Sequence, residues 1–480
     1  MKNLINDKRA FLFLPFIALV FILIYSPSTS PLYVYEGFDS CTFKTIGIGI
    51  LEGKIPYTDL FDHKGPILFW LNALGLLCGR VGLFSLEVIF FSAMLVCAYR
   101  IARLYTNESK AFAASLLTLI PTIDFITEGN QCEIYMLPFI ALSLYMALRY
   151  TTGRMPSHPL IYSFFYGIAF AIIFFIRPND AVSHVGVIMF GIFLLMLNQK
   201  EYGNAIANAI AFVGGALVVT IPILLYFYAI GSLGDMLYGM IGYNLQYSSE
   251  SGLNEGSIGI LLIPIIIYGG TIFLSRRNDR NSWFIFIPSL IFTLILIGKR
   301  DYYHYLLPTL PMFCIFTSKC LNIGYTKVIA GISLLFAIFS VRQHVMLFKC
   351  ASQRSEMSEL YRQTRELFQM VPESERSQIW NHNLYQLLCE KSPHVYSMTG
   401  IWSNAGVSPA NRIFIPFHRC RFGKEASLSE NTPKWLLATE TAIVENVLDE
   451  QFLKDNYRVI ASTTDNCVAR IVLYKLRENE

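Results

Sequence analysis

Eleven apolar runs occupy most of the first 343 residues, and they constrain the fold more than any other feature. An apolar run of about 17–25 residues can cross a bilayer as a helix, because a helix satisfies its own backbone hydrogen bonds there. Charged residues make up 15% of the chain, against about a quarter in soluble proteins. The sequence therefore predicts a polytopic α-helical membrane protein. The predicted spans are 10–27, 84–104, 110–127, 134–150, 160–177, 181–198, 205–230, 257–275, 283–298, 303–320 and 326–343.

Basic residues in the short loops set the predicted orientation, because Lys and Arg favour the cytoplasmic side. One segment, Gly65 to Gly79, is apolar but too short for an ordinary span. If it crossed the membrane, the basic loop at 100–110 would lie outside and the later basic loops would conflict with it. We therefore expect a juxtamembrane or re-entrant helix on the outer face, within a first outer loop at 28–83. The basic residues assigned to the inside are Lys2, Lys8, Arg9, Arg100, Arg103, Lys110, Arg149, Arg154, Lys200, Arg276, Arg277, Arg280, Lys319 and Lys327.

The composition becomes polar from residue 344 onward. The segment YRQTRELFQMV is typical of an amphipathic helix, and several short segments rich in β-branched and aromatic residues are typical of strands. We predict a transmembrane domain at 1–343 and an extracytoplasmic α/β domain at 344–480. The strand candidates are HVYSMTG, NRIFIPF, KWLLATETAIV, YRVIAST and ARIVLYKL.

Ionisable residues gather on the predicted outer face. The stretch YEGFDSCTFKTIGIGILEGKIPYTDLFDHKGPILFWL lies directly after the first span, and acids or cations also occur in TEGNQCEIYMLPF, FFIRPND and RDYYHYLLPTLP. Charges at membrane depth are costly, so such a gathering favours a functional site over a passive surface. Acids facing cations would suit the binding of an anion beside a base.

These four segments resemble the GT-C superfamily of polyprenyl-phosphate-sugar-dependent glycosyltransferases. The resemblance covers roughly residues 10–345, and the chain is similar to the branch that includes protein O-mannosyltransferases and the lipid A aminoarabinose transferase. The first-loop pattern is the most specific part: an Asp soon after the first helix, then a charged turn with Lys-Gly-Pro that enters an apolar helix. The other three segments are weak signals alone.

The resemblance implies a catalytic Asp in the first outer loop, which is Asp39 here, with the neighbouring acid Glu36 as a weaker candidate. Glu133 stands where the family commonly has Asp, and Arg177 stands in an Arg-Pro setting where the family often has Lys-Gly. Both departures leave the roles of these residues open. The predicted site has Asp39 and Glu133 as catalytic residues, Lys64, Arg177, Arg300 and His304 as donor-phosphate ligands, and Asp62 and His63 as accessory residues.

Each of these residues also has a structural alternative. Asp62 can cap the helix that follows it, and Arg177 can extend to the membrane interface. The tyrosines near His304 fit an interfacial aromatic belt. No spacing of acids or histidines demands a metal, and a lipid-phosphate leaving group does not require one. We therefore expect neither a metal nor another cofactor.

The predicted function is inverting transfer of a hexosyl or pentosyl group from a polyprenyl-phosphate donor to a glycan, lipid or protein acceptor. The predicted place is the outer face of the bacterial inner membrane, in contact with membrane lipid. A net charge of +4 gives no reason to expect nucleic acid. The alternatives are a secondary transporter, although no internal repeat is visible, or a polymerase of lipid-linked glycans, which would share the donor chemistry.

Overall fold

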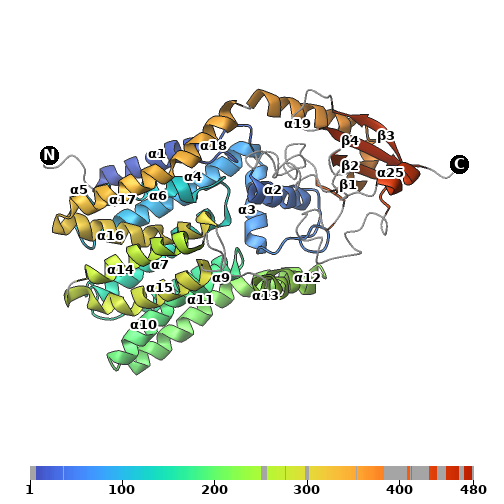
Figure 1. Cartoon of the computed structure of the whole chain (residues 1–480). Helices are drawn as coiled ribbons and strands as arrows, with labels where there is room; N and C mark the ends of the chain where they lie inside the picture. The colour runs from blue at the N-terminus through green and yellow to red at the C-terminus, as the bar shows by residue number, and fades with distance from the viewer. Residues whose placement is uncertain are drawn as a thin grey trace.

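The computed structural model is a helical bundle followed by a small sheet (Figure 1). It describes residues 7–35, 37–249, 257–275, 277–297, 302–352, 354–382, 408–410, 412, 432–439, 450–463 and 470–477, and the statements below refer to these residues.

Helices occupy each of the predicted spans. Six helical segments are long and apolar enough to cross a membrane, and the other apolar helices are shorter. The predicted fold class is confirmed, while the number of eleven spans stays a prediction. The bundle consists of α1 (Asp7–Tyr25), α4 (Gly79–Ala102), α5 (Glu108–Leu117), α6 (Leu119–Phe125), α7 (Cys132–Thr151), α8 (Leu160–Phe174), α9 (Pro178–Asp180), η1 (Ala181–Gly186), α10 (Val187–Asn198), α11 (Tyr202–Ala229), α14 (Ser257–Phe273), η3 (Arg277–Ser282), α15 (Trp283–Ile297), η4 (Tyr303–Thr309), α16 (Leu310–Ile323) and α17 (Thr326–Phe339).

Two helices lie between the first two long ones, α2 (Phe38–Leu51) and α3 (Pro66–Leu76). The 11 residues of α3 extend about 17 Å, at 1.5 Å per residue. This is too short for a hydrocarbon core of about 30 Å. Figure 1 shows α3 running across the direction of the long helices, at the side of the bundle that faces the sheet. Its length and course fit the juxtamembrane helix predicted from the sequence.

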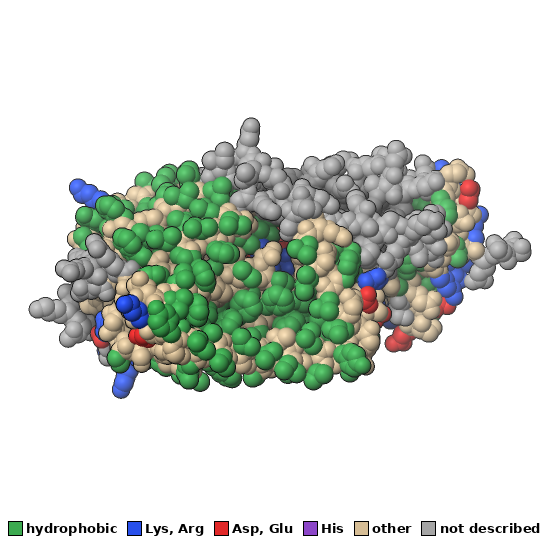
Figure 2. Space-filling view, turned by 90° about the horizontal axis from the view of Figure 1, so that it is seen from below, with side chains coloured by type: hydrophobic (Ala, Val, Ile, Leu, Met, Phe, Trp, Pro, Cys, Tyr) green, Lys and Arg blue, Asp and Glu red, His purple; other side chains and the backbone are tan. Residues whose placement is uncertain are grey.

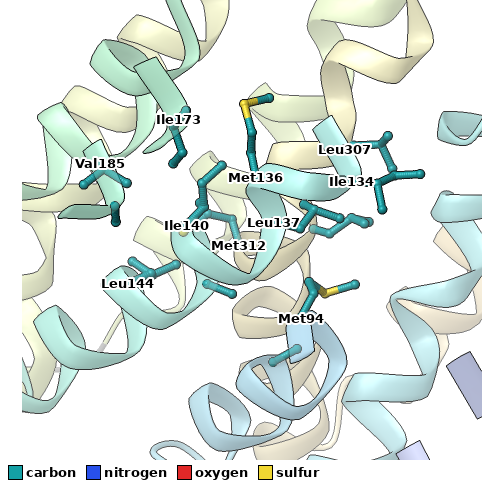
Figure 3. Close-up of a cluster of buried hydrophobic side chains, with 14 of the residues drawn as sticks. Met94, Ile134, Met136, Leu137, Ile140, Leu144, Ile173, Val185, Leu307 and Met312 are labelled. Carbon is teal, nitrogen blue, oxygen red and sulfur yellow. The ribbon is translucent and has the colours of Figure 1, made fainter. Parts of the chain in front are cut away.

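The core of the bundle is built around α7. Most of the α7 side chains are buried, on several sides of the helix, which is typical of a helix surrounded by others. Figure 3 shows Ile134, Leu137 and Ile140 of α7 beside Met94 of α4 and Met312 of α16. Since most of α7 is buried against its neighbours, a residue in its first turn is held in a fixed place.

The outside of the bundle is apolar. Figure 2 shows hydrophobic side chains covering most of the visible bundle surface, with Lys, Arg, Asp and Glu side chains toward the two ends. Helix α11 alone exposes Ile206, Ile210 and Leu225 by 60% or more. A band of this kind is suited to lipid rather than water.

The chain leaves the bundle through α18 (Val341–Ser352) and α19 (Arg354–Gln369), then η5 (Glu373–Gln378). The four-stranded sheet has the order β1-β2-β4-β3, in which only β1 and β2 are parallel. Its elements are β1 (Ile379–His382), β2 (Trp435–Thr439), α25 (Glu450–Asn456), β3 (Tyr457–Ser462) and β4 (Ile471–Leu476).

Three of the predicted strands coincide with β2, β3 and β4, whereas β1 was not predicted. The strand candidate at 394–400 and, apart from Arg412, the candidate at 411–417 lie outside the described residues. Leu360 and Leu367 of α19 pack with Leu437 and Leu473 on one face of the sheet. The division of the chain at residue 344, which falls inside α18, stays a prediction.

Candidate functional site

A turn from Asp62 to Gly65 connects the first outer loop to α3. One carboxylate oxygen of Asp62, Oδ1, accepts the backbone N–H of Lys64 at 2.8 Å. The backbone N–H of Gly65 donates to the carbonyl of Ile176 at 2.9 Å. A Cβ on Gly65 would lie 2.0 Å from the carbonyl oxygen of Phe175, so only glycine permits this approach. The turn is therefore fixed against the segment that follows α8.

Lys64 projects from this turn with hydrogen-bonding capacity to spare. Among the described residues, the one hydrogen-bonding neighbour of its Nζ is Nε2 of His63, at 3.2 Å, although an ammonium group has three donors. Burial acts to lower the pKa of Lys64, but the pKa is raised overall, chiefly by the nearby Cys132 and Tyr305 side chains and to a smaller extent by Asp39. Lys64 is thus a protonated donor available to an anion.

The segment α12 (Leu233–Leu237), η2 (Tyr238–Tyr243) and α13 (Asn244–Ser249) packs over the turn. The rings of Tyr243 and His63 are stacked with centroids 5.7 Å apart. The side-chain amide of Asn244 donates to the carbonyl of His63 at 2.9 Å. These contacts orient the residue beside the Lys64 amine.

A buried ionic cluster faces this turn from the bundle. Arg177 donates through Nη1 to Oε1 of Glu133, and its Nε lies 3.0 Å from Oδ2 of Asp180. Both carboxylates are 0% exposed. Buried charges are tolerated when they are paired, and here one guanidinium serves two carboxylates.

Further contacts immobilise Arg177. Its guanidinium carbon lies 3.8 Å from the ring centroid of Tyr305, a cation–π distance. His184 Nε2 lies 3.5 Å from Oδ1 of Asp180. Asp180, His184 and Tyr305 were not among the site residues predicted from the sequence. The available signal was the spacing of an acid three residues after Arg177 and a histidine four residues after that acid.

Asp39 lies in the first turn of α2 and is half-buried. Its neighbour Ser40 accepts a hydrogen bond from Asn130, just before α7, at 3.1 Å, and the charge of Asp39 acts on both Lys64 and His304. His304, in η4, has its Nε2 3.9 Å from Oε1 of Glu133. Arg300 and Glu36 lie outside the described residues.

The structure thus brings most of the predicted residues to one end of the bundle. No group of three or more His, Cys, Asp and Glu side chains in the described part of the chain is arranged to hold a metal ion. The residues gathered there are Asp39, Asp62, His63, Lys64, Glu133, Arg177 and His304.

A segment of the tail reaches the rim of the first outer loop. The hydroxyl of Ser408 donates to Glu52, and Nζ of Lys54 donates to the carbonyl of Pro409 at 2.7 Å. Arg412 Nε donates to the carbonyl of Tyr57 at 2.7 Å. The first outer loop is therefore in contact both with the bundle and with the tail.

The comparisons with known proteins agree with this architecture. The sequence model of one family, described as "Putative competence-induced protein Ccs4 N-terminal domain", matches residues 9–347. The chain belongs to this family. A search of curated protein sequences gives no match.

Solved structures extend the likeness to the fold of the whole chain. The crystal structure of ArnT from Cupriavidus metallidurans bound to undecaprenyl phosphate has a TM-score of 0.59 at 12% identity and covers 97% of each chain. The same protein in its apo state also gives 0.59 at 12% identity, over 98% of each chain. The archaeal oligosaccharyltransferase AglB from Archaeoglobus fulgidus, in complex with an inhibitory peptide and a dolichol-phosphate, gives 0.49 at 12% identity, over 98% of this chain and 74% of that one. The fold of this family member is the GT-C fold expected from its sequence.

Proposed function

We propose that this protein is a membrane glycosyltransferase that moves a sugar from a polyprenyl-phosphate donor to an acceptor hydroxyl. The observation that supports it best is the placement of a half-buried carboxylate, Asp39, at the same end of a GT-C fold as the amine of Lys64. A base and an anion-binding cation are the two groups that such a transfer requires.

In the proposed step, the acceptor hydroxyl gives its proton to Asp39 while its oxygen attacks the anomeric carbon. The bond between that carbon and the phosphate oxygen breaks, and the electron pair stays on the lipid phosphate. The sugar configuration inverts. Charge that develops on the phosphate is stabilised by Lys64, because a charge-assisted hydrogen bond is stronger than a neutral one.

Arg177 takes a different part in this proposal from the one predicted for it. Its Nη1 already donates to Glu133, its Nε lies 3.0 Å from Oδ2 of Asp180, and its face covers the ring of Tyr305. In the proposal, Lys64 therefore contacts the phosphate directly. Arg177 adds positive charge without touching the phosphate, and it holds Glu133 in place. Direct phosphate contacts from His304 and Arg300 stay predictions.

The fold and apolar surface make this a membrane protein. We further propose that the site opens on the outer face of a bacterial inner membrane and that the tail is extracytoplasmic. The lipid chain of the donor would then stay in the bilayer while its sugar meets a glycan, lipid or protein acceptor from the aqueous side.

The test is transfer of labelled sugar from a panel of polyprenyl-phosphate donors in proteoliposomes, with wild type compared with Asp39→Asn. We expect a loss of about 100-fold or more, in the range for removing a general base. Asp59→Asn is the matched control, since Asp59 is an exposed acid of the same loop that accepts the backbone N–H of Ile55. Equal losses in both variants would contradict a special role of Asp39.

Transfer that survives Asp39→Asn would keep the activity but move the base to another acid, with Glu36 and Glu133 as the next candidates. Folded wild-type protein that neither transfers sugar nor hydrolyses any donor would overturn the proposal and favour a transporter, to be tested by uptake assays.

A further inference from the structure

A second buried carboxylate, Glu87, lies in α4 away from the ionic cluster. It is 0% exposed and accepts three hydrogen bonds, from Ser26 Oγ at 2.7 Å, Thr29 Oγ1 at 2.5 Å and the backbone N–H of Asn130 at 3.0 Å. A carboxylate within a membrane helix is costly, and it is retained where it serves the site or the fold. Neither the base nor the phosphate contact proposed above uses it.

A buried cation accompanies Glu87. Lys44 of α2 is 3% exposed, and its charge acts on Glu87. Its Nζ also donates to the carbonyl of Ser28 at 2.7 Å. The carboxylate and the amine therefore fasten the same loop, at 26–30, from two sides.

The loop at 26–30 supports the start of the helix that carries Asp39. The hydroxyl of Ser28 accepts the backbone N–H of Gly37, at the N-cap of α2, at 3.0 Å. A Cβ on Gly129, which has φ +82°, would lie 1.9 Å from Ser26 Oγ. The loops at 26–30 and 128–131 are thus in direct contact over Glu87.

Asn130 extends the network to the other site helices. Its Nδ2 donates to Ser40 Oγ at 3.1 Å, next to Asp39 on α2, and to Asn72 Oδ1 at 2.9 Å on α3. Its Oδ1 accepts the hydroxyl of Tyr135 at 2.5 Å, on α7. One polar network therefore joins three helices: α2, which carries the proposed base, α3, which follows the Lys64 turn, and α7, which has Glu133 in its first turn.

We propose that Glu87 is a positioning residue that sets the placement of Asp39 relative to Lys64 and Glu133. This inference rests on the proposed function. Glu87 acts through Asn130 and the loop at 26–30, and it contacts no reacting group. A carboxylate is suited to the task because its two oxygens accept all three donors, whereas a glutamine amide has one acceptor oxygen and would turn an NH₂ group toward a donor.

The experiment compares Glu87→Gln with Glu87→Asp in the full-length protein. We expect Glu87→Gln to lower kcat by about 10- to 100-fold, the scale expected for a misplaced reacting group. KM for the donor and the Kd for undecaprenyl phosphate should stay within about threefold, since Lys64 is intact. Glu87→Asp keeps the charge and should recover part of the kcat.

Hydrogen–deuterium exchange provides a readout that does not depend on activity. In Glu87→Gln, exchange should rise in peptides that cover 26–41 and 128–131 and stay unchanged in α16. The matched control is Asp279→Asn, which removes another buried carboxylate from the same bundle and should leave kcat and these peptides unchanged.

Three results would overturn the positioning role: an unchanged kcat in folded Glu87→Gln, an equal loss in Asp279→Asn, or increased exchange throughout the bundle. If the wild type shows no transfer, hydrogen–deuterium exchange alone tests the positioning role of Glu87. A local increase at 26–41 would then support the positioning of α2 although the glycosyltransferase proposal fails, and no local increase would overturn the positioning role as well.

Discussion

The two ends of the bundle each contain a buried ion pair, but the two are built differently. Glu133 lies in the first turn of α7, and Thr151, in the last turn, bonds to Ser282 of η3, the segment that contains Asp279. Twenty residues of helix separate these ends by about 30 Å. At the η3 end, Lys319 pairs with Asp279 and lies over the ring of Tyr105.

Among the side chains that the structure describes, the η3 end pairs the amine of Lys319 with the carboxylate of Asp279, and the same amine donates to Ser275 Oγ at 3.3 Å. At the other end, one guanidinium serves two carboxylates, and the amine of Lys64 stands nearby with an imidazole as its neighbour. An amine and a carboxylate that neutralise each other are expected to stabilise the fold without taking part in a reaction. An unbalanced group of charges with a donor to spare is suited to binding a further charged molecule. Four predictions test this contrast, in order of decreasing effect on the free energy of unfolding.

Replacing Arg177 with glutamine should be the most damaging change, because it leaves Glu133 and Asp180 buried without their cation. We expect the free energy of unfolding to fall by about 5 kcal/mol, the upper end for breaking a buried pair. Denaturant unfolding in detergent micelles measures it. Arg149→Gln, which removes a guanidinium bonded to the hydroxyl of Tyr162, is the control and should cost about 1 kcal/mol. Equal effects would mean that the cluster is no more interdependent than a single hydrogen bond.

Lys319→Met should lower the free energy of unfolding by about 3 kcal/mol, since it strands one carboxylate. Adding Asp279→Asn should restore most of that loss, because the second change removes the stranded charge. Sugar transfer per folded molecule should not change in either variant. If the double variant is no more stable than Lys319→Met, then the unpaired charge of Asp279 is not what destabilises the single variant.

Gly65→Ala tests the close approach of the Lys64 turn to the segment after α8. The added methyl group would overlap the Phe175 carbonyl, and we expect a loss of about 1–3 kcal/mol, as for other overpacked sites. Gly203→Ala is the control, because a Cβ there meets nothing within 4 Å and alanine favours the helix. A Gly65→Ala variant as stable as Gly203→Ala would mean that the turn can move freely.

Lys64→Gln should have the smallest effect on stability, less than about 1 kcal/mol, because the hydrogen-bonding neighbour of its amine is an imidazole and no described carboxylate lies within ion-pair distance. Binding of undecaprenyl phosphate should nevertheless weaken by about 10- to 100-fold, the value of one charge-assisted hydrogen bond. Isothermal titration in detergent can measure this loss. If binding is unchanged while stability falls, Lys64 has a structural role like that of Lys319 and does not bind the phosphate.

Much of the fold could be predicted from the sequence because each span is a local property. The apolar run of α7 and the shortness of α3 are visible without any knowledge of their neighbours. The gathering of Asp39, Lys64 and Glu133 was also predictable, but only through the resemblance to a known superfamily, since nothing local joins three separate segments.

Which polar side chains pair with each other could not be predicted from the sequence in the same way. Glu133 and Arg177 are 44 residues apart, and their pairing depends on how α7 and α8 pack. Glu87 is one acid within the predicted span 84–104, and its three donors come from two loops distant in the chain. Hydrophobic patterns identify the helices but do not specify which polar groups meet between them.

The contact between Glu52 and Ser408 has a consequence for the making of the protein. The two residues are 356 positions apart. At about 5–20 residues per second, a ribosome needs roughly 20–70 s to pass from one to the other. During that time the first outer loop exists without its later neighbour, while α2, α3 and α4 are already synthesised. A nascent chain arrested before residue 408 should therefore leave the loop around Glu52 open to protease, and release of the last 73 residues should close it.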